Sequence, residues 1–173
     1  MRSPRTVVTF CVTTLAALLL AGCASLNAPL HPQYIVPDDA RLSASLYGYS
    51  QAVRVGPWIT VSGQVGYDPA TGAYGKTLEE QASLAFANLA RVLRAAGASL
   101  SDVTSITTYQ TDMRDLNAVV YARNAAFGDH RPTWTMVGVP ALALPQLEFE
   151  VSATAYAPEK RRSAGGSTTD PGQ

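Results

Sequence analysis

Residues 77–111 read TLEEQASLAFANLARVLRAAGASLSDVTSITTYQT, and this stretch decides the fold. Apolar residues recur in its first half at the three- and four-residue spacing of one helix face. Thr77 with Glu80 three residues later forms a capping box that starts a helix, and Gly97 is typical of the residue just past a helix end. From Val103 onward β-branched residues predominate, which favours a strand. The stretch therefore predicts a helix with one core-facing stripe, followed directly by a strand.

The same kinds of signal continue on both sides of this stretch. Strands are predicted at residues 49–55, 58–62, 103–111, 133–139 and 147–156, and a second helix at residues 112–127. Gly56-Pro57 separates the first two strands and is a hairpin signal. Asp112 and Asp115 can cap the second helix, which Gly128 ends. The order is therefore ββαβαββ, an α+β domain with both helices between strands of one mixed sheet.

The last predicted strand separates two kinds of side chain. Phe149, Val151, Ala153 and Ala155 point one way, and Glu148, Glu150, Ser152 and Thr154 point the other. The two helices cover only one face of the sheet, so the second face remains exposed to solvent unless a partner subunit covers it. We therefore expect the domain to form oligomers.

The N-terminus has the pattern of an export signal. A basic start precedes an apolar run at residues 7–20, which is too short to be a membrane-spanning helix. The run ends in Leu20-Ala21-Gly22-Cys23, which resembles the lipobox of bacterial lipoproteins. By that resemblance, residues 1–22 are a signal peptide that is removed and Cys23 carries the lipid. The expected location is the cell envelope, at the periplasmic side of the outer membrane.

Composition narrows the possible functions of the mature chain. Cleavage before Cys23 would remove two of the 13 basic residues and leave all 13 acidic ones, so the domain is slightly acidic and lacks the charge pattern of a nucleic-acid binder. Cys11 leaves with the signal, and His31 and His130 are isolated, so neither a disulfide nor a metal site is expected. We expect a tether at residues 23–44, a domain at 45–157 and a disordered tail at 158–173.

Six segments, in one order and spacing, resemble the RidA/YjgF family. They are YSQAV at 49–53, VSGQVG at 61–66, AAGASLSDV at 95–103, TDM at 111–113, FGDHRP at 127–132 and FEV at 149–151. The resemblance implies a chorismate-mutase-like homotrimer with ligand clefts between its subunits. It also implies hydrolysis of reactive enamines and imines to keto acids and ammonia, without a metal or an organic cofactor.

Four residues match the pocket of that family. Tyr49 and Ser62 match its tyrosine and serine, and Gly63 matches the glycine whose backbone faces the ligand. A glutamate on the last strand is proposed in the family to activate water, and Glu150 falls on that position. Glu148, two residues earlier, is a rival because the loop before it is slightly longer.

Two further ligand-binding positions depart from the family. Val120 stands in place of an asparagine on the second helix, and Asn124 one turn on is the alternative donor. Trp134, followed by Thr135, stands where the deaminating branch has the arginine that pairs with the substrate carboxylate. Arginine offers a planar, charged guanidinium group with several N–H donors, whereas tryptophan offers one neutral N–H. Because a charged hydrogen bond contributes about 1.5–3 kcal/mol, we predict a loss of well over tenfold in affinity for amino-acid-derived imines. The other interpretation is that Trp134 only fills the cleft as core.

These residues leave two functions open. One is a hydrolase of the enamine/imine deaminase type with altered specificity, in which Glu150 is the general base. The other is a non-catalytic trimer that binds a small molecule or a partner protein in its clefts. Whether the chain is an enzyme is therefore not decided by its sequence. The ribonuclease activity sometimes ascribed to the family fits poorly with an acidic domain that lacks a basic groove.

Overall fold

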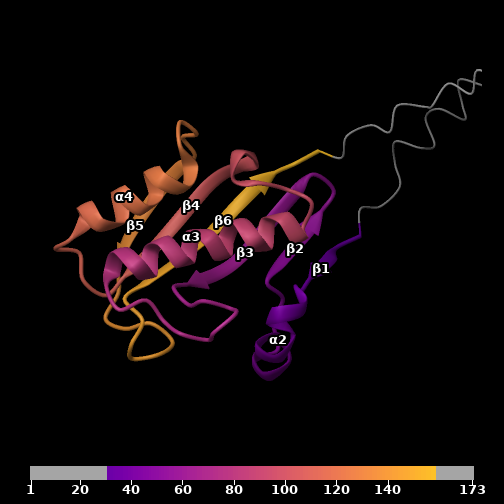
Figure 1. Ribbon diagram of the computed structural model, residues 1–173. Coiled ribbons are helices and arrows are strands. Elements are labelled where there is room, and N and C mark those ends of the chain that lie inside the picture. Colours follow the sequence, from indigo (N-terminus) through magenta and orange to yellow (C-terminus); the bar gives the residue numbers. More distant parts are fainter. Residues whose placement is uncertain (1–30, 159–173) are drawn as a thin grey trace, which may run out of the picture. The chain divides into compact units, whose positions relative to one another are not determined.

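A six-stranded mixed sheet with two long helices on one face forms the domain (Figure 1). The computed structural model describes residues 31–158. The strands are β1 (Gln33–Ile35), β2 (Ala52–Val55), β3 (Trp58–Val65), β4 (Val103–Gln110), β5 (Thr133–Gly138) and β6 (Phe149–Tyr156). The helices are α2 (Arg41–Tyr47), α3 (Leu78–Ala95) and α4 (Leu116–Phe127), with short 3-10 turns η2 (Asp38–Ala40) and η3 (Leu100–Asp102).

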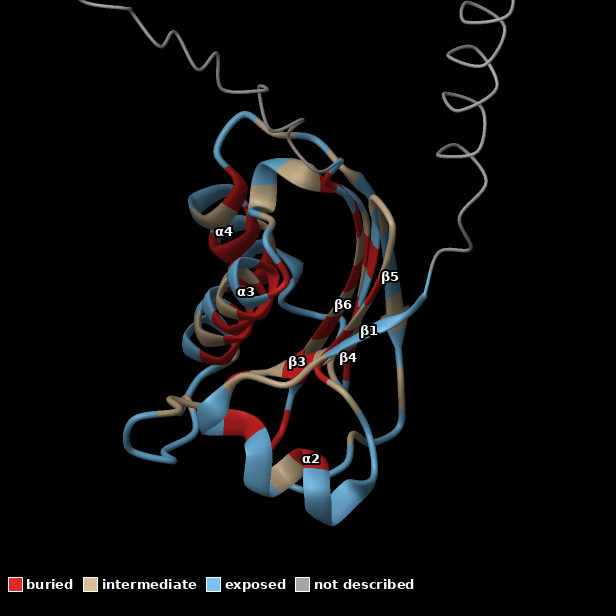
Figure 2. Cartoon of the chain, turned by 90° about the vertical axis from the view of Figure 1, so that its right-hand side faces the viewer, coloured by how far each residue is buried: buried red, intermediate tan, exposed pale blue. Residues whose placement is uncertain are grey.

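The sheet order confirms the predicted α+β class. The strands lie in the order β1-β2-β3-β6-β4-β5. β4 and β5 run parallel, and the other neighbours are antiparallel. From β2 onward the element order is the predicted ββαβαββ, and α3 and α4 lie on the same face of the sheet (Figure 2).

Helix α3 begins and ends where its sequence predicts. The Thr77 hydroxyl accepts a hydrogen bond from the backbone N–H of Glu80 at 3.2 Å, so Thr77 is the N-cap. The Glu80 carboxylate accepts from the N–H of Lys76 at 2.7 Å, one residue earlier than in a standard capping box. Gly97 follows the last turn with a φ of +75°, a left-handed conformation that glycine adopts without strain.

The core fills the space between the two long helices and the sheet. The Phe86 ring of α3 lies with its centroid 5.6 Å from that of Phe149 in β6 and 5.8 Å from that of Phe127 in α4. Burial of each such side chain stabilises the fold by about 1.5–3 kcal/mol. β6 alternates as predicted, with Phe149, Val151, Ala153 and Ala155 buried and Glu150, Ser152 and Thr154 half-buried on the opposite face. That opposite face therefore remains without a helix layer, as Figure 2 shows for the described residues.

The domain begins earlier than the predicted boundary at residue 45. From Gln33 onward the expected tether is folded: β1 pairs with β2, which puts Ile35 opposite Ala52, and α2 follows. A strand of three residues and a helix of seven are too short to show a hydrophobic period, so the sequence does not reveal them. Cys23 and the signal lie outside the described residues. No helix within residues 31–158 is long and apolar enough to cross a membrane.

Helix α4 begins at Leu116 rather than near Asp112. Asp115 is its N-cap and accepts from the backbone N–H of Ala118 at 3.3 Å. Asp112 instead accepts hydrogen bonds from the guanidinium and the backbone N–H of Arg114, and these hold the pKa of its carboxyl at about 2. Of the two predicted caps, only Asp115 therefore serves the helix.

Candidate functional site

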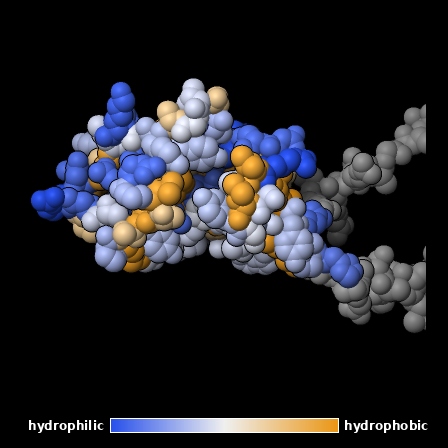
Figure 3. All heavy atoms as spheres, turned by 90° about the horizontal axis from the view of Figure 1, so that it is seen from below, coloured by the Kyte–Doolittle hydropathy of each residue, from blue (hydrophilic) through white to orange (hydrophobic). Residues whose placement is uncertain are grey.

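A cavity of about 580 Å³ lies at one end of the sheet, beside β3 and β6. Its lining includes Leu42 and Tyr47 of α2, Tyr49 and Gln51 before β2, Ser62, Gly63, Gln64 and Val65 of β3, Tyr67, Tyr74, Leu144, Leu147 and Glu150. Figure 3 views the domain from this end and shows hydrophobic side chains in separate groups among polar ones. The cavity thus brings together Tyr49, Ser62, Gly63 and Glu150, four residues that the sequence assigns to the pocket.

Glu150 lines this cavity from the start of β6. On β6 it pairs with Val65 of β3 and Tyr109 of β4. Its side chain lies over Gly63, at an irregularity in the register between β3 and β6, so close that a β-carbon at residue 63 would collide with the carboxylate unless the Glu150 side chain moved. The close approach of a carboxylate explains why glycine stands there.

The Glu150 carboxyl has no ion pair within residues 31–158, and neither a hydrogen bond nor a neighbouring charge contributes to the shift of its pKa. Burial raises its pKa, because removal from water disfavours the charged form. The rival Glu148 is exposed, precedes β6 and does not line the cavity, and its backbone N–H donates to Gln81. Glu150 is thus the glutamate at the cavity.

A chain of amides orients Tyr49. Gln64 donates to the side-chain oxygen of Gln51 at 2.8 Å, and Gln51 in turn donates to the Tyr49 hydroxyl oxygen at 2.8 Å. Because the Tyr49 oxygen accepts this bond, its own O–H remains available to donate to a ligand. The Ser62 hydroxyl donates to the Ser50 carbonyl at 2.7 Å, which joins β3 to the segment that precedes β2.

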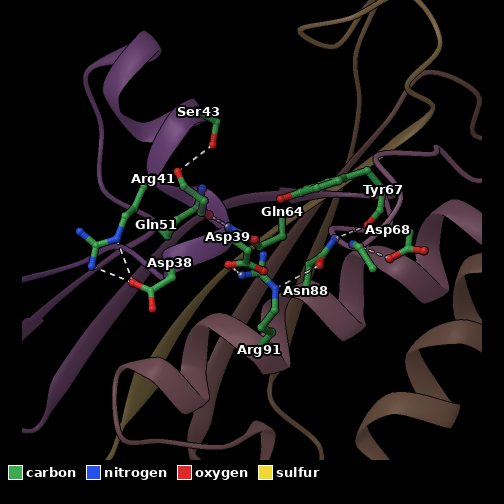
Figure 4. Close-up of polar contacts among 12 residues, drawn as sticks. Asp38, Asp39, Arg41, Ser43, Gln51, Gln64, Tyr67, Asp68, Asn88 and Arg91 are labelled. Carbon is green, nitrogen blue, oxygen red and sulfur yellow. Dashed lines mark hydrogen bonds and ion pairs between the residues drawn. The ribbon is translucent and has the colours of Figure 1, made fainter.

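A second polar network supports the cavity from α3 (Figure 4). Asn88 donates to the carbonyls of Val65 and Tyr67, at 3.0 and 2.8 Å. Arg91 donates to Asp39 of η2 at 2.7 Å, and one further nitrogen of its guanidinium is buried without a partner among the described residues. Burial also raises the pKa of the Tyr67 hydroxyl. The network therefore connects the long helix, the end of β3 and the segment that carries α2.

Trp134 and Thr135 do not line this cavity within one chain. In the register of β5, Trp134 pairs with Ile106 and lies on the helix side of the sheet, whereas Thr135 pairs with Thr107 on the open side. The indole N–H donates to the Thr108 hydroxyl at 3.0 Å, and the ring packs against the core. Val120 is half-buried on α4 and also lies away from the cavity. Strand alternation and the position of β5 at the sheet edge separate these residues from Glu150.

Arg123 is a buried charge that the sequence analysis missed. Its side chain is 4% exposed on α4, and its guanidinium carbon lies 5.9 Å from the Trp134 ring centroid and 5.2 Å from that of Phe127. Its Nη2 donates to the His130 carbonyl at 2.8 Å, while its Nε has no partner within the described part of the chain. Burial lowers the pKa of this guanidinium. The sequence does contain a signal for this burial: Val119, Arg123 and Phe127 are spaced four residues apart, which places Arg123 on the core-facing side of the helix.

His130 is half-buried. Its Nε2 lies 2.7 Å from the Val103 carbonyl oxygen, and its ring stacks on Phe127. Within residues 31–158, no group of three or more histidine, cysteine, aspartate or glutamate residues is arranged to hold a metal ion.

Fold and cavity together define an α+β domain with a ligand-sized cavity at the end of its sheet. The family described as Endoribonuclease L-PSP matches residues 40–157. This chain belongs to that family, the RidA/YjgF family.

Individual relatives agree with this assignment. A RutC family protein of Pyrococcus abyssi is 38% identical over 109 residues, which cover 62% of this chain and 85% of that protein. The 2-iminobutanoate/2-iminopropanoate deaminase of Salmonella typhimurium is 30% identical over 114 residues, covering 65% and 89%. A YjgF/YER057c/UK114 family protein of Mycobacterium tuberculosis superimposes with a TM-score of 0.65 at 33% identity, covering 73% of this chain and all of that structure.

Proposed function

We propose that this chain is a RidA-like lipoprotein of the cell envelope that hydrolyses a small imine or enamine lacking the usual carboxylate. The observation that carries the proposal is the unpaired Glu150 carboxyl in a cavity that also contains Tyr49 and Gly63. An unpaired carboxyl in a cavity costs free energy, so a role in the site is its simplest explanation. The deaminase name of the Salmonella relative supports the class of reaction.

The reaction needs a base and a positioned water. Glu150 would take a proton from water as the water oxygen bonds to the C=N carbon, and its raised pKa makes the carboxylate a stronger base than an ordinary glutamate. The C–N bond then breaks, a carbonyl forms, and nitrogen leaves as ammonia with the protons of water. The Tyr49 O–H, free to donate, would hold the substrate nitrogen or the attacking water.

Neighbouring subunits would complete the site. The open sheet face and the edge strand β5 leave both surfaces free for a trimer, as the family resemblance implies. In such a trimer Val120, Trp134 and Thr135 of one subunit would approach the cavity of the next. The Trp134 N–H already donates to Thr108, so a substrate carboxylate would find no free donor on this side chain. That supports a substrate without a carboxylate.

A second function, binding without catalysis, is favoured by one specific observation. The Trp134 ring is half-buried against the core, which fits a residue that has replaced an arginine and now serves packing. A trimer of this kind would hold a small molecule in its clefts and present it at the membrane. Ribonuclease activity has less support, because the described lining contains Asp39 and Glu150 and no basic side chain.

The two functions differ in a kinetic experiment. Ammonia release would be followed with imines generated enzymatically, for the parent chain, Glu150→Gln and the matched control Glu148→Gln. The proposed hydrolase accelerates release, loses that acceleration in Glu150→Gln and keeps it in Glu148→Gln. If the parent chain does not exceed the uncatalysed rate with any imine, the binding function is the better account. Palmitate labelling that disappears in Cys23→Ala would test the lipid anchor.

A further inference from the structure

The outer wall of the cavity is built by α2, which precedes the YSQAV motif. Leu42 and Tyr47 line the cavity although they are 74% and 75% exposed, so each offers an unused hydrophobic surface to a ligand. The buried Ala40 and Ala44 anchor this segment, and the Asp39–Arg91 ion pair joins it to α3. The wall is therefore a fixed part of the domain.

The cavity has one uncompensated charge. Its lining contains two carboxylates, Asp39 and Glu150, and no lysine, arginine or histidine among the described residues. Asp39 is neutralised by Arg91 at 2.7 Å, whereas Glu150 has no such partner within residues 31–158. The net charge facing a ligand is thus negative whenever Glu150 is ionised.

Aromatic side chains line the same cavity as this charge. Tyr47, Tyr49, Tyr67 and Tyr74 all line the cavity, and the rings of Tyr67 and Tyr74 lie 6.4 Å apart between centroids. Tyrosine faces attract cations as well as flat apolar groups. A negative carboxylate in a cavity that such rings also line favours a ligand that joins a positive charge to an aromatic ring.

We propose that this cavity selects small aromatic cations, namely protonated arylalkyl amines and the corresponding iminium ions, with Glu150 paired to the nitrogen and α2 against the ring. The inference rests on the proposed function in using the same cavity, and it names the substrate class. With an iminium substrate, Glu150 takes a proton from water as the water oxygen bonds to carbon and passes it to the adjacent nitrogen. The C–N bond then breaks, a carbonyl forms, and nitrogen leaves as ammonium with both protons of the water. Anionic acids are disfavoured because they would face Glu150 without a cation to offset it.

Three probes that share a phenyl ring and differ in charge test this selectivity. The full chain, purified in detergent, is titrated calorimetrically with 2-phenylethylamine, 2-phenylethanol and phenylacetate, with detergent alone as the blank. We expect the amine to bind about tenfold tighter than the alcohol and the acid to bind weakest, because a charged hydrogen bond replaces a neutral one.

Two pairs of variants assign the selectivity to its residues. Glu150→Gln should bring the amine to the affinity of the alcohol and leave the alcohol unchanged, and Glu148→Gln should change neither. Leu42→Ala should weaken the binding of the amine and of the alcohol alike. Leu46 is 70% exposed on the same helix but lies outside the cavity, so Leu46→Ala should leave the binding of both unchanged. An amine preference that survives Glu150→Gln, or an acid that binds as tightly as the amine, would overturn the inference.

These titrations, together with the ammonia-release assay, separate this inference from the proposed reaction. Amine selectivity without acceleration of ammonia release would support the proposed ligand class and contradict the proposed hydrolase activity. Acceleration of ammonia release without amine selectivity would support the proposed hydrolase activity and contradict the proposed ligand class.

Discussion

The Glu150 carboxylate and the α-carbon of Gly63 lie in direct contact, and a β-carbon added at residue 63 would be 1.7 Å from Glu150 Oε1. Gly63 has no left-handed φ, so alanine is conformationally acceptable there, and the conflict is with the end of a flexible side chain. The contact therefore links a backbone position on β3 to the orientation of one functional group on β6.

Gly63→Ala should displace the Glu150 carboxylate and leave the fold intact. We expect amine selectivity to fall to the level of Glu150→Gln, and the double variant to show no further loss. Gly66→Ala is the contrasting control, because its β-carbon would lie 2.3 Å from the backbone of Gln81, which cannot move aside. Denaturant titration should show Gly66→Ala destabilised by about 1–3 kcal/mol and Gly63→Ala nearly unchanged. Retained selectivity in Gly63→Ala would count against the contact.

Glu150 should also make stability depend on pH. Burial raises its pKa, so the folded state holds this proton more tightly than the unfolded state. The free energy of unfolding should therefore fall as pH rises from the ordinary glutamate pKa through the raised one. Glu150→Gln removes this pH dependence. At pH values above the raised pKa, the melting temperature of the variant should exceed that of the parent chain, and at pH values below the ordinary glutamate pKa the two should be similar. Parallel curves for the two chains would contradict the raised pKa.

The neighbourhood of Trp134 predicts a non-additive pair of substitutions. Trp134→Arg would place a second guanidinium near Arg123, which lies 5.9 Å from the indole, so the single variant should be destabilised by about 1–2 kcal/mol. Adding Arg123→Gln removes the repulsion, and the double variant should regain most of that loss. Chemical denaturation of the four chains in the cycle measures the coupling. Equal effects of Trp134→Arg in both backgrounds would show that the two positions do not interact.

The Asp39–Arg91 ion pair should hold α2 against the domain. Asp39→Asn is expected to weaken this contact by about 1 kcal/mol, since the pair is partly shielded from solvent. Proteolysis within residues 41–47 should then become faster. Asp38→Asn is the matched control, because Asp38 pairs with Arg41 in full exposure. If both variants are cleaved at the same rate, the ion pair of Arg91 does not hold α2 against the domain.

The long elements of this fold could be predicted from sequence, and the short ones could not. The cap at Thr77, the stop at Gly97 and the alternation of β6 are local patterns, and each reappears in the structure. β1 and α2 contain too few residues to show a period, although α2 supplies one wall of the cavity. Local pattern is thus sufficient for the framework but not for the rim of the site.

Pocket residues divide in a similar way. Tyr49, Ser62, Gly63 and Glu150 gather in one cavity because β3 and β6 are neighbours in the sheet. Trp134 and Thr135 alternate across an edge strand, and a sequence motif does not show which face each takes relative to Glu150. The contact between Arg123 and Trp134 depends on how α4 packs on β5, which is a tertiary property.

The most direct test compares two imines in one assay. Ammonia release above the uncatalysed rate would be measured with the imine formed by oxidation of 2-phenylethylamine and with the imino acid released from serine by a dehydratase. We expect acceleration with the carboxylate-free imine, little acceleration with the imino acid, and loss of the acceleration with the carboxylate-free imine in Glu150→Gln. Faster hydrolysis of the imino acid than of the arylalkyl imine would contradict this expectation.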